Sequence, residues 1–198
     1  MENINELKRI HRAAKYYEQL QGLRQVPFGI LFLFLAVWKA GEWPWFEKWQ
    51  PISSFVFLGL TMLISWGIGI YYERTFGKVQ QTAESKRNSV IMAILFLAGI
   101  YLLGIAEIIW NWPVSGAGLF MALILLVYYY LTDSFRLQYL LFAGLMAVVS
   151  VLPLFGVLPA AQVYILGVEG VVGVALMGVL WLVSGLVDHW LLVRSLPK

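Results

Sequence analysis

The sequence predicts an all-α integral membrane protein: a six-transmembrane-helix bundle preceded by an N-terminal amphipathic interfacial helix. Hydrophobic residues make up 61% of the 198 positions and charged residues only 13%, which is about half the charged share of a soluble domain. The mean hydropathy is +0.77. Apolar residues are gathered in long runs, and Gly, Pro, Asn and charged residues punctuate the gaps between them. A chain of this composition cannot cover itself with a polar surface, so we expect lipid to be its solvent.

Residues 1–25 are expected to form a cytoplasmic amphipathic helix. Apolar side chains recur there at three- and four-residue spacing, at Ile4, Leu7, Ile10, Ala14, Tyr17 and Leu20. This is the period of one helix face, and charged residues fill many of the other positions. Such a helix lies on the inner membrane surface. It is also able to pack on the cytoplasmic ends of the bundle, and the two arrangements are compatible.

Residues 26–196 are expected to form the transmembrane domain. A helix crosses a bilayer with roughly 20 mostly apolar residues, and six segments approach this length. They are 26–40, 52–72, 89–110, 115–131, 137–153 and 162–193. The first is short and opens at Pro27, which suits a first helical turn. The last is long, about 48 Å at 1.5 Å per residue, so it must tilt, break near its glycines or project into the cytoplasm.

The charge distribution predicts the orientation. With six spans and a cytoplasmic N-terminus, only Lys39 and Lys48 of the 14 lysines and arginines fall outside. The others fall on the cytoplasmic side: Lys8, Arg9, Arg12, Lys15, Arg24, Arg74, Lys78, Lys86, Arg87, Arg136, Arg194 and Lys198. Cytoplasmic loops carry such an excess of cations. We therefore expect a multi-pass protein of the cell inner (plasma) membrane, of a bacterial cell or an equivalent, with both termini in the cytoplasm.

Ionisable residues inside a membrane are costly, which makes them candidates for function. On this topology five polar residues lie at a similar level near the outer side: Lys39, Glu107, Asn111, Gln162 and Glu169. One hypothesis is that they converge on a pocket for an ion or a substrate. The interpretation we favour is a structural salt bridge between Lys39 and one glutamate, with the other glutamate at the interface. Glycines around Glu169 would let its helix approach a neighbour closely.

A second polar group is expected near the inner side. It consists of Arg74, Asp133, Arg136, Asp188 and His189. Asp188 next to His189 invites a catalytic or proton-relay interpretation, but adjacent helical residues do not face each other. We expect instead that Asp188 pairs with Arg74 or Arg136, and that His189 lies at the headgroup level.

Several chemistries are excluded or unsupported. The chain has no cysteine, which excludes disulfides, thiolate metal sites and cysteine nucleophiles. Ser115 opens an inward span while His189 closes another, so about 25–30 Å should separate them; a serine–histidine dyad needs about 3 Å. Paired-histidine metal spacing and nucleotide-binding loops are missing from the sequence. We expect no metal, no cofactor and no nucleic-acid partner.

The arrangement of segments carries a resemblance. A charged loop at 73–88 follows the second span, an amphipathic helix precedes the first, and an uncharged linker, "LPLFGVLPAAQ", covers 152–162. In outline, over the whole chain, this layout resembles the six-span membrane subunits of type-2 ABC exporters. The resemblance implies a permease-like transporter subunit and a separate cytoplasmic ATPase docking on residues 1–25 and 73–88. It also implies a re-entrant element within the linker.

Two other function classes stay open. One is an accessory or sensory membrane protein without a transport path, which binds a cytoplasmic partner through residues 1–25 and 73–88. The other, weaker, is a lipid-acting enzyme that uses Asp188, His189 and Arg74. An enzyme is the less expected outcome. The substrate and the oligomeric state do not follow from the sequence.

Overall fold

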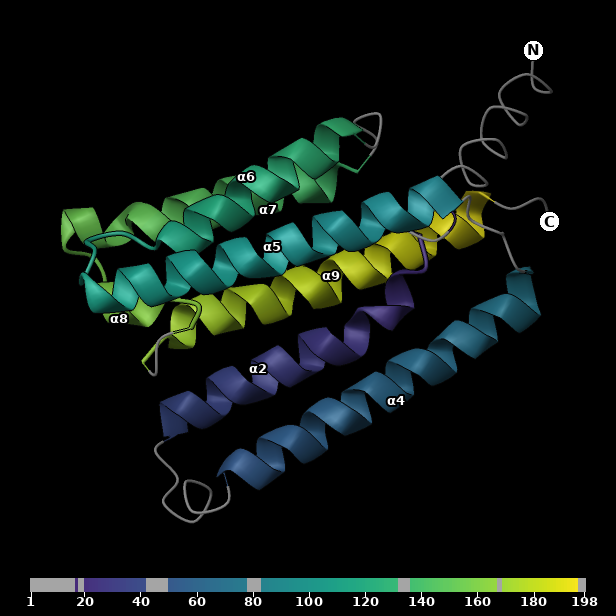
Figure 1. Ribbon diagram of the computed structural model, residues 1–198, viewed down its shortest axis with the longest axis horizontal. Coiled ribbons are helices and arrows are strands. Elements are labelled where there is room, and N and C mark those ends of the chain that lie inside the picture. Colours follow the sequence, from purple (N-terminus) through teal and green to yellow (C-terminus); the bar gives the residue numbers. More distant parts are fainter. Residues whose placement is uncertain are drawn as a thin grey trace. The chain divides into compact units, whose positions relative to one another are not determined.

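The computed structural model describes residues 17, 20–41, 50–77, 83–131, 136–166 and 169–195, and all regular secondary structure in these ranges is helical (Figure 1). The elements are η1 (Gly22–Arg24), α2 (Val26–Gly41), α4 (Gln50–Phe76), α5 (Ala83–Ile109), α6 (Gly116–Leu131), α7 (Leu137–Val151), η2 (Leu152–Phe155), α8 (Ala160–Val163) and α9 (Val171–Ser195). The predicted all-α class is confirmed for this part of the chain. Most of the predicted amphipathic segment 1–25, up to Tyr16, lies outside the described residues.

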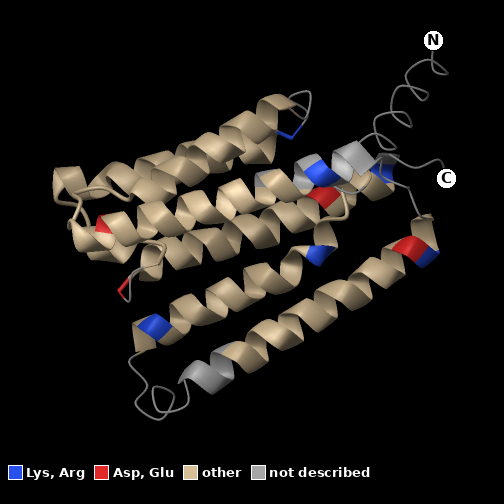
Figure 2. Cartoon of the chain, viewed as in Figure 1, with Lys and Arg blue, Asp and Glu red and all other residues tan. Residues whose placement is uncertain are grey.

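Four of these helical stretches are long and apolar enough to cross a membrane. They are Gly22–Gly41, Phe55–Phe76, Leu137–Phe155 and Val171–Arg194. Two more apolar helices, Ala93–Ile109 and Gly116–Leu131, are shorter. In Figure 2 the charged residues lie toward the helix ends and the middle parts of the helices are free of them. The helices therefore have the composition of a membrane protein, with four spans by length.

The last predicted segment, 162–193, is not one continuous helix. Helix α8 ends at Val163, and α9 begins only at Val171. A Cβ on Gly173 would lie 2.6 Å from the backbone oxygen of Val163, so the chain folds back on itself and needs a glycine at this contact. Of the three ways to accommodate the long segment, the chain uses a break near its glycines.

The chain divides into two compact units, each described by itself. The first unit comprises Met1–Leu31, Pro44–Gln80 and Val179–Lys198. The second unit comprises Phe32–Trp43 and Gln81–Gly178. Helices α2 and α9 contribute residues to both units.

The first unit is built around a close backbone crossing. A Cβ on Gly22 would lie 2.1 Å from the backbone oxygen of Gly185, and a Cβ on Gly185 would lie 2.6 Å from that of Gly22. Only glycine at both positions lets η1 pass directly over α9. The start of α2 continues the contact, because the Phe28 and Trp181 rings lie 5.6 Å apart. Ser65 of α4 donates a hydrogen bond to the backbone oxygen of Arg24.

The second unit contains a hairpin of α6 and α7, which lie side by side (Figure 1). Each helix buries one face at three- and four-residue spacing. The buried residues are Gly116, Ala117, Gly118, Met121, Ala122 and Leu125 of α6, and Tyr139, Phe142, Ala143, Met146 and Ser150 of α7. Small residues in both faces allow the close helix packing that is common in membranes. Helix α5 packs beside α6.

Candidate functional site

The buried carboxylate of the second unit belongs to Glu107, in the last turn of α5. Glu107 is completely inaccessible to solvent. Its Oε2 atom accepts hydrogen bonds from the hydroxyl of Ser115 at 3.2 Å and from the backbone N–H of Ala117 at 3.0 Å. The first N–H groups of a helix have no partner within the helix, and a negative charge is favoured there by the helix dipole. Glu107 therefore caps the N-terminus of α6 from the preceding helix.

Ser115 is the residue that completes this cap. Its hydroxyl accepts the N–H of Gly118 at 3.1 Å, the usual arrangement of a serine N-cap. Its own N–H donates to the backbone oxygen of Ser150 at 3.0 Å, close to the end of α7. One residue thus joins the C-terminal end of α5, the start of α6 and the end of α7.

The loop before α6 is held from the other side by Tyr164. The hydroxyl of Tyr164 donates to the backbone oxygen of Trp112, and the N–H of Trp112 donates to the backbone oxygen of Glu107. Burial, and then the charge of Glu107, raise the pKa of Tyr164 above its ordinary value. Asn111 turns the chain with a positive φ of 46°. This backbone conformation is uncommon except for Gly, Asn and Asp.

The other residues predicted for the outer pocket have different surroundings. Asn111 is exposed in the α5–α6 loop, and Glu169 is exposed in the loop before α9. Gln162 is half-buried in α8, and Lys39 is half-buried near the end of α2. The predicted span 162–193 placed Glu169 inside a helix; this is wrong, because α9 begins at Val171 and Glu169 lies in the loop before it. The hydrogen bonds that engage Glu107 come from Ser115 and Ala117, residues that the sequence-based scheme did not assign to the site.

A second polar site lies in the first unit, where Tyr72 of α4 meets His189 of α9. The hydroxyl of Tyr72 and the Nδ1 atom of His189 are 2.8 Å apart. The same hydroxyl accepts the backbone N–H of Leu23 at 3.2 Å. Tyr72 is completely buried. Three elements that are distant in the sequence, η1, α4 and α9, therefore share one hydroxyl group.

Tyr17 extends this site to the end of α4. Its hydroxyl lies 2.8 Å from the backbone oxygen of Gly77 and 3.2 Å from that of Tyr72. Gly77 follows α4 with a φ of 85°, as expected for a glycine that ends a helix. Burial raises the pKa of Tyr17 above its ordinary value. Tyr17 and Leu20 are both buried, so this part of the N-terminal segment packs on the bundle, the second of the two arrangements expected for it.

The residues predicted for the inner group differ in burial. Asp188 is completely buried in α9, whereas Arg74 is exposed in the last turn of α4. His189 contacts Tyr72, which the sequence analysis did not single out. Asp133 lies outside the described residues, and the pairing of Asp188 with Arg74 or Arg136 stays a prediction.

Arg136 has an aromatic setting in the second unit. It is completely buried just before α7, and its guanidinium carbon lies 5.6 Å from the ring centroids of both Tyr128 and Tyr139. It also donates a hydrogen bond of 3.4 Å to the hydroxyl of Tyr128. A guanidinium over aromatic faces is stabilised by the ring quadrupoles. The sequence analysis did not single out these tyrosines.

Among the described residues, no group of three or more His, Asp or Glu side chains is arranged to hold a metal ion. Comparisons with protein-family models, with curated proteins and with solved structures find no match to this chain.

Proposed function

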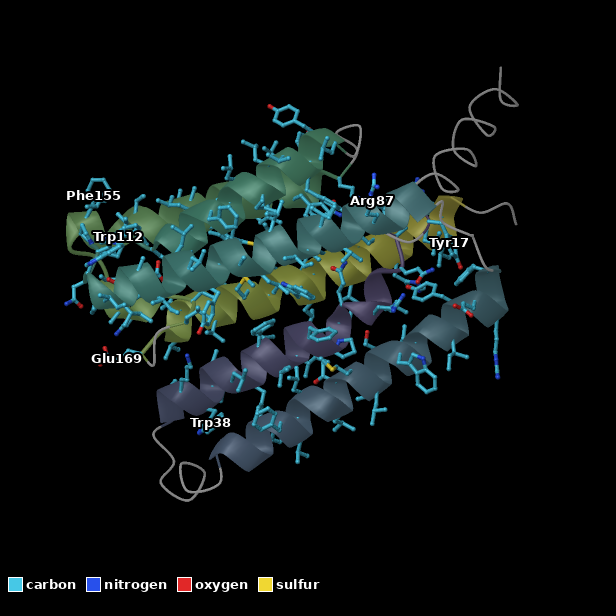
Figure 3. The ribbon with its side chains drawn as sticks, viewed as in Figure 1. Tyr17, Trp38, Arg87, Trp112, Phe155 and Glu169 are labelled. Atoms are coloured by element: carbon cyan, nitrogen blue, oxygen red, sulfur yellow. The ribbon has the colours of Figure 1, made fainter. Side chains whose placement is uncertain are left out.

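We propose that the chain is a six-span membrane protein with both termini in the cytoplasm. Four spans follow from helix length, and the course of the second unit supports two more. Helices α5, α6 and α7 lie beside one another in order. Arg87 of α5 lies at one end of this unit, and Trp112 and Phe155 lie at the other (Figure 3). Because α7 with η2 is long enough to cross, α5 and α6, which run between the same two ends, are expected to cross as well.

The absence of native cysteine makes this topology testable with single cysteines. Arg87, Trp110, Leu131 and Phe155 are all exposed and mark successive ends of α5, α6 and α7. A membrane-impermeant thiol reagent should label Trp110→Cys and Phe155→Cys in intact cells. It should label Arg87→Cys and Leu131→Cys only after permeabilisation. Labelling of Arg87→Cys and Trp110→Cys from the same side would remove α5 from the spans.

We further propose that the protein acts by binding a cytoplasmic protein partner and has no transport path of its own. The observation that carries this proposal is the hydrogen bond from Tyr17 to Gly77. It joins the N-terminal segment to Gly77, which follows α4 within the predicted charged loop 73–88; in the structure, α4 continues to Phe76 and α5 begins at Ala83, so both ends of that predicted loop are helical. The described end of the N-terminal segment and the first part of segment 73–88 therefore meet at the end of α4, within the first unit.

The surroundings of Glu107 and Glu169 favour a partner-binding protein over a permease. A transport pocket was expected to contain both carboxylates. Glu107 is instead buried as a cap for α6, and Glu169 is exposed in a loop. A carboxylate that neutralises a helix end has a structural role without any ligand.

A pull-down from native membranes in mild detergent tests the proposal, with captured proteins identified by mass spectrometry and then purified. Tyr17→Phe removes the hydroxyl that joins the two segments and leaves the ring. It should weaken binding of the purified partner. Tyr71→Phe is the matched control, because Tyr71 is exposed on the same helix, and it should bind normally. Equal binding by both variants and by the unmodified chain would reject the composite surface.

One observation favours a proton- or ion-binding permease as the second candidate. The Oε1 atom of Glu107 is buried and has no hydrogen-bond partner among the described residues. A buried acceptor without a partner is costly, and a transported cation or proton would supply one. If Glu107→Gln abolishes a measured flux while the protein stays folded, the permease is supported. If the purified partner binds Glu107→Gln normally and no flux is found, the accessory function stands.

A further inference from the structure

The hydrogen bond between Tyr72 and His189 depends on the protonation state of the His189 imidazole. A phenol has one proton to donate. The hydroxyl of Tyr72 accepts the Leu23 N–H, and its only other hydrogen-bond partner among the described residues is Nδ1 of His189. When the imidazole is neutral and carries its proton on Nε2, the phenol donates its own proton to Nδ1. The Tyr72 hydroxyl then has both an acceptor for its proton and a donor, the Leu23 N–H.

A second proton on the imidazole disrupts this arrangement. Both ring nitrogens of a charged histidine are donors, so Nδ1 no longer accepts the phenol proton. Tyr72 would then have to accept from both Leu23 and His189, and its own proton would lose its acceptor in a completely buried position. A buried donor without a partner destabilises the state that contains it. The junction is therefore compatible with neutral His189 and strained by the charged form.

We propose that protonation of His189 releases Tyr17 and residues 20–25 from the ends of α4 and α9, so that the Tyr72–His189 contact is a pH-sensitive latch on the cytoplasmic docking surface. The assignment of that surface rests on the proposed function. The latch itself does not, because it consists only of groups within the chain. Release separates Tyr17 from Gly77 and divides the surface into its two segments.

The charged and titratable groups around the latch come from α4, from α9 and from the N-terminal segment. From α4, Tyr71 and Glu73 adjoin Tyr72 and are exposed. Asp188, on α9, lies within electrostatic reach of Tyr72 and favours a positive charge nearby. Arg24 of the N-terminal segment is exposed, where water screens its repulsion. The phenol of Tyr17 is neutral near pH 7, because burial raises its pKa. Arg194 is exposed near the end of α9, and its guanidinium lies over the ring of Trp190. An ordinary imidazole changes charge between about pH 5 and 8.

Hydrogen exchange followed by mass spectrometry tests the latch on the full chain in lipid nanodiscs. Peptides covering residues 20–25 are compared at about pH 8 and about pH 5, with exchange rates corrected for the intrinsic effect of pH. We expect protection of this segment at the higher pH. At the lower pH, exchange should be about tenfold faster, the equivalent of losing one hydrogen bond.

Histidine variants identify the group that titrates, because the chain has only two histidines, His11 and His189. His189→Asn keeps an acceptor near the Nδ1 position and cannot titrate, so it should stay protected at both pH values. His189→Gln serves if the asparagine variant does not fold. His11→Asn should behave as the unmodified chain. Equal protection at both pH values in the unmodified chain, or a pH effect that survives in His189→Asn, would overturn the latch.

A binding measurement separates the latch from the proposed function. The affinity of the purified partner is measured at the same two pH values, with the unmodified chain and with His189→Asn. If exchange responds to pH as expected and no partner binds, the latch stands and the accessory function fails. If a partner binds the unmodified chain equally well at both pH values although exchange differs between them, the latch does not regulate that surface. This part of the proposal is then rejected.

Discussion

Ser115 donates its hydroxyl proton to Glu107 across the tight α5–α6 connection, at 3.2 Å. The same hydroxyl accepts from Gly118, so the first turn of α6 and the last turn of α5 are held through one atom. An acidic residue in an apolar helix is commonly taken as a functional group. Here its two hydrogen bonds explain its presence through local helix capping.

Replacing Glu107 tests this capping role. Glu107→Gln keeps an oxygen that accepts from Ser115 and Ala117. It loses the attraction between a charge and the helix end, about 0.3–1 kcal/mol, and places its NH2 group at the buried Oε1 position. Glu107→Ala leaves the Ala117 N–H buried without an acceptor, which costs about 1–3 kcal/mol. Unfolding in detergent followed by circular dichroism should therefore rank the unmodified chain above Glu107→Gln, and Glu107→Gln above Glu107→Ala.

Ser115→Ala provides a comparison for the same cap. It removes a serine N-cap, for which the expected loss is about 0.5–2 kcal/mol. Combined with Glu107→Ala, the loss should be smaller than the sum of the two single effects, because the residues share one interaction. Strict additivity, or equal stability of Glu107→Ala and Glu107→Gln, would contradict the capping role.

The glycine crossing of the first unit gives a second prediction. A Cβ on Gly185 would lie 2.6 Å from the backbone oxygen of Gly22 and 3.0 Å from a methyl group of Val26. Backbone cannot move aside cheaply, so Gly185→Ala should lower the free energy of unfolding by about 1–3 kcal/mol. It should also expose Leu20, which is 1% exposed in the structure. Limited proteolysis near residue 20 would detect this displacement.

Gly67→Ala is the matched control for this substitution. Gly67 lies in α4, and a Cβ there would meet nothing within 4 Å. Alanine is the better helix former by about 0.5–1 kcal/mol, so this variant should be as stable as the unmodified chain or more stable. If both alanine variants behave alike, the close approach of Gly22 and Gly185 does not limit stability.

The fold class could be predicted from the sequence because it depends on composition and on apolar runs, which are local properties. The predicted segment 26–40 became α2, Val26–Gly41, and 115–131 became α6, Gly116–Leu131. The break before α9 was not located, because the single charged residue Glu169 between apolar runs was taken as a polar group inside a span. Its signal was the group of glycines, and the position of the break depends on the contact of Gly173 with Val163.

The sites were less predictable, for two different reasons. Glu107 could be recognised as important, but its role depended on a turn that brings Ser115 back to it, and the serine was considered only as a nucleophile. The partner of His189 was beyond reach, because Tyr72 lies 117 residues away in the sequence. Contacts of this range are set by the packing of helices, and the apolar patterns of the two helices do not specify which residues meet.

Packing between α6 and α7 gives a third prediction. A Cβ on Gly118 would lie 2.1 Å from the hydroxyl oxygen of Ser150 and 3.3 Å from its Cβ. Gly118→Ala should therefore be destabilising by about 1–3 kcal/mol. Ser150→Ala removes the nearer atom, so the double variant should recover part of the loss. Gly144→Ala on α7 is the control, since nothing lies within 4 Å of its added Cβ. A double variant no more stable than Gly118→Ala would show that the clash is not with Ser150.

The raised pKa of Tyr164 gives the fourth prediction, on alkaline stability. Its phenol stays protonated to a higher pH in the folded chain than in the unfolded chain, where it ionises near about pH 10. The unfolded state therefore loses its proton first as the pH rises, and the free energy of unfolding falls above that pH. Tyr164→Phe lacks this group, so it should be less stable than the unmodified chain at neutral pH by about 1 kcal/mol, the loss of the bond to Trp112. The difference in stability between the two chains should shrink as the pH rises above about 10.

Glu107→Gln removes the charge near Tyr164 and should lower the pKa of Tyr164 toward its ordinary value. An ultraviolet difference titration against Tyr164→Phe would measure this pKa. A pKa of Tyr164 that does not move in Glu107→Gln would mean that burial alone raises it.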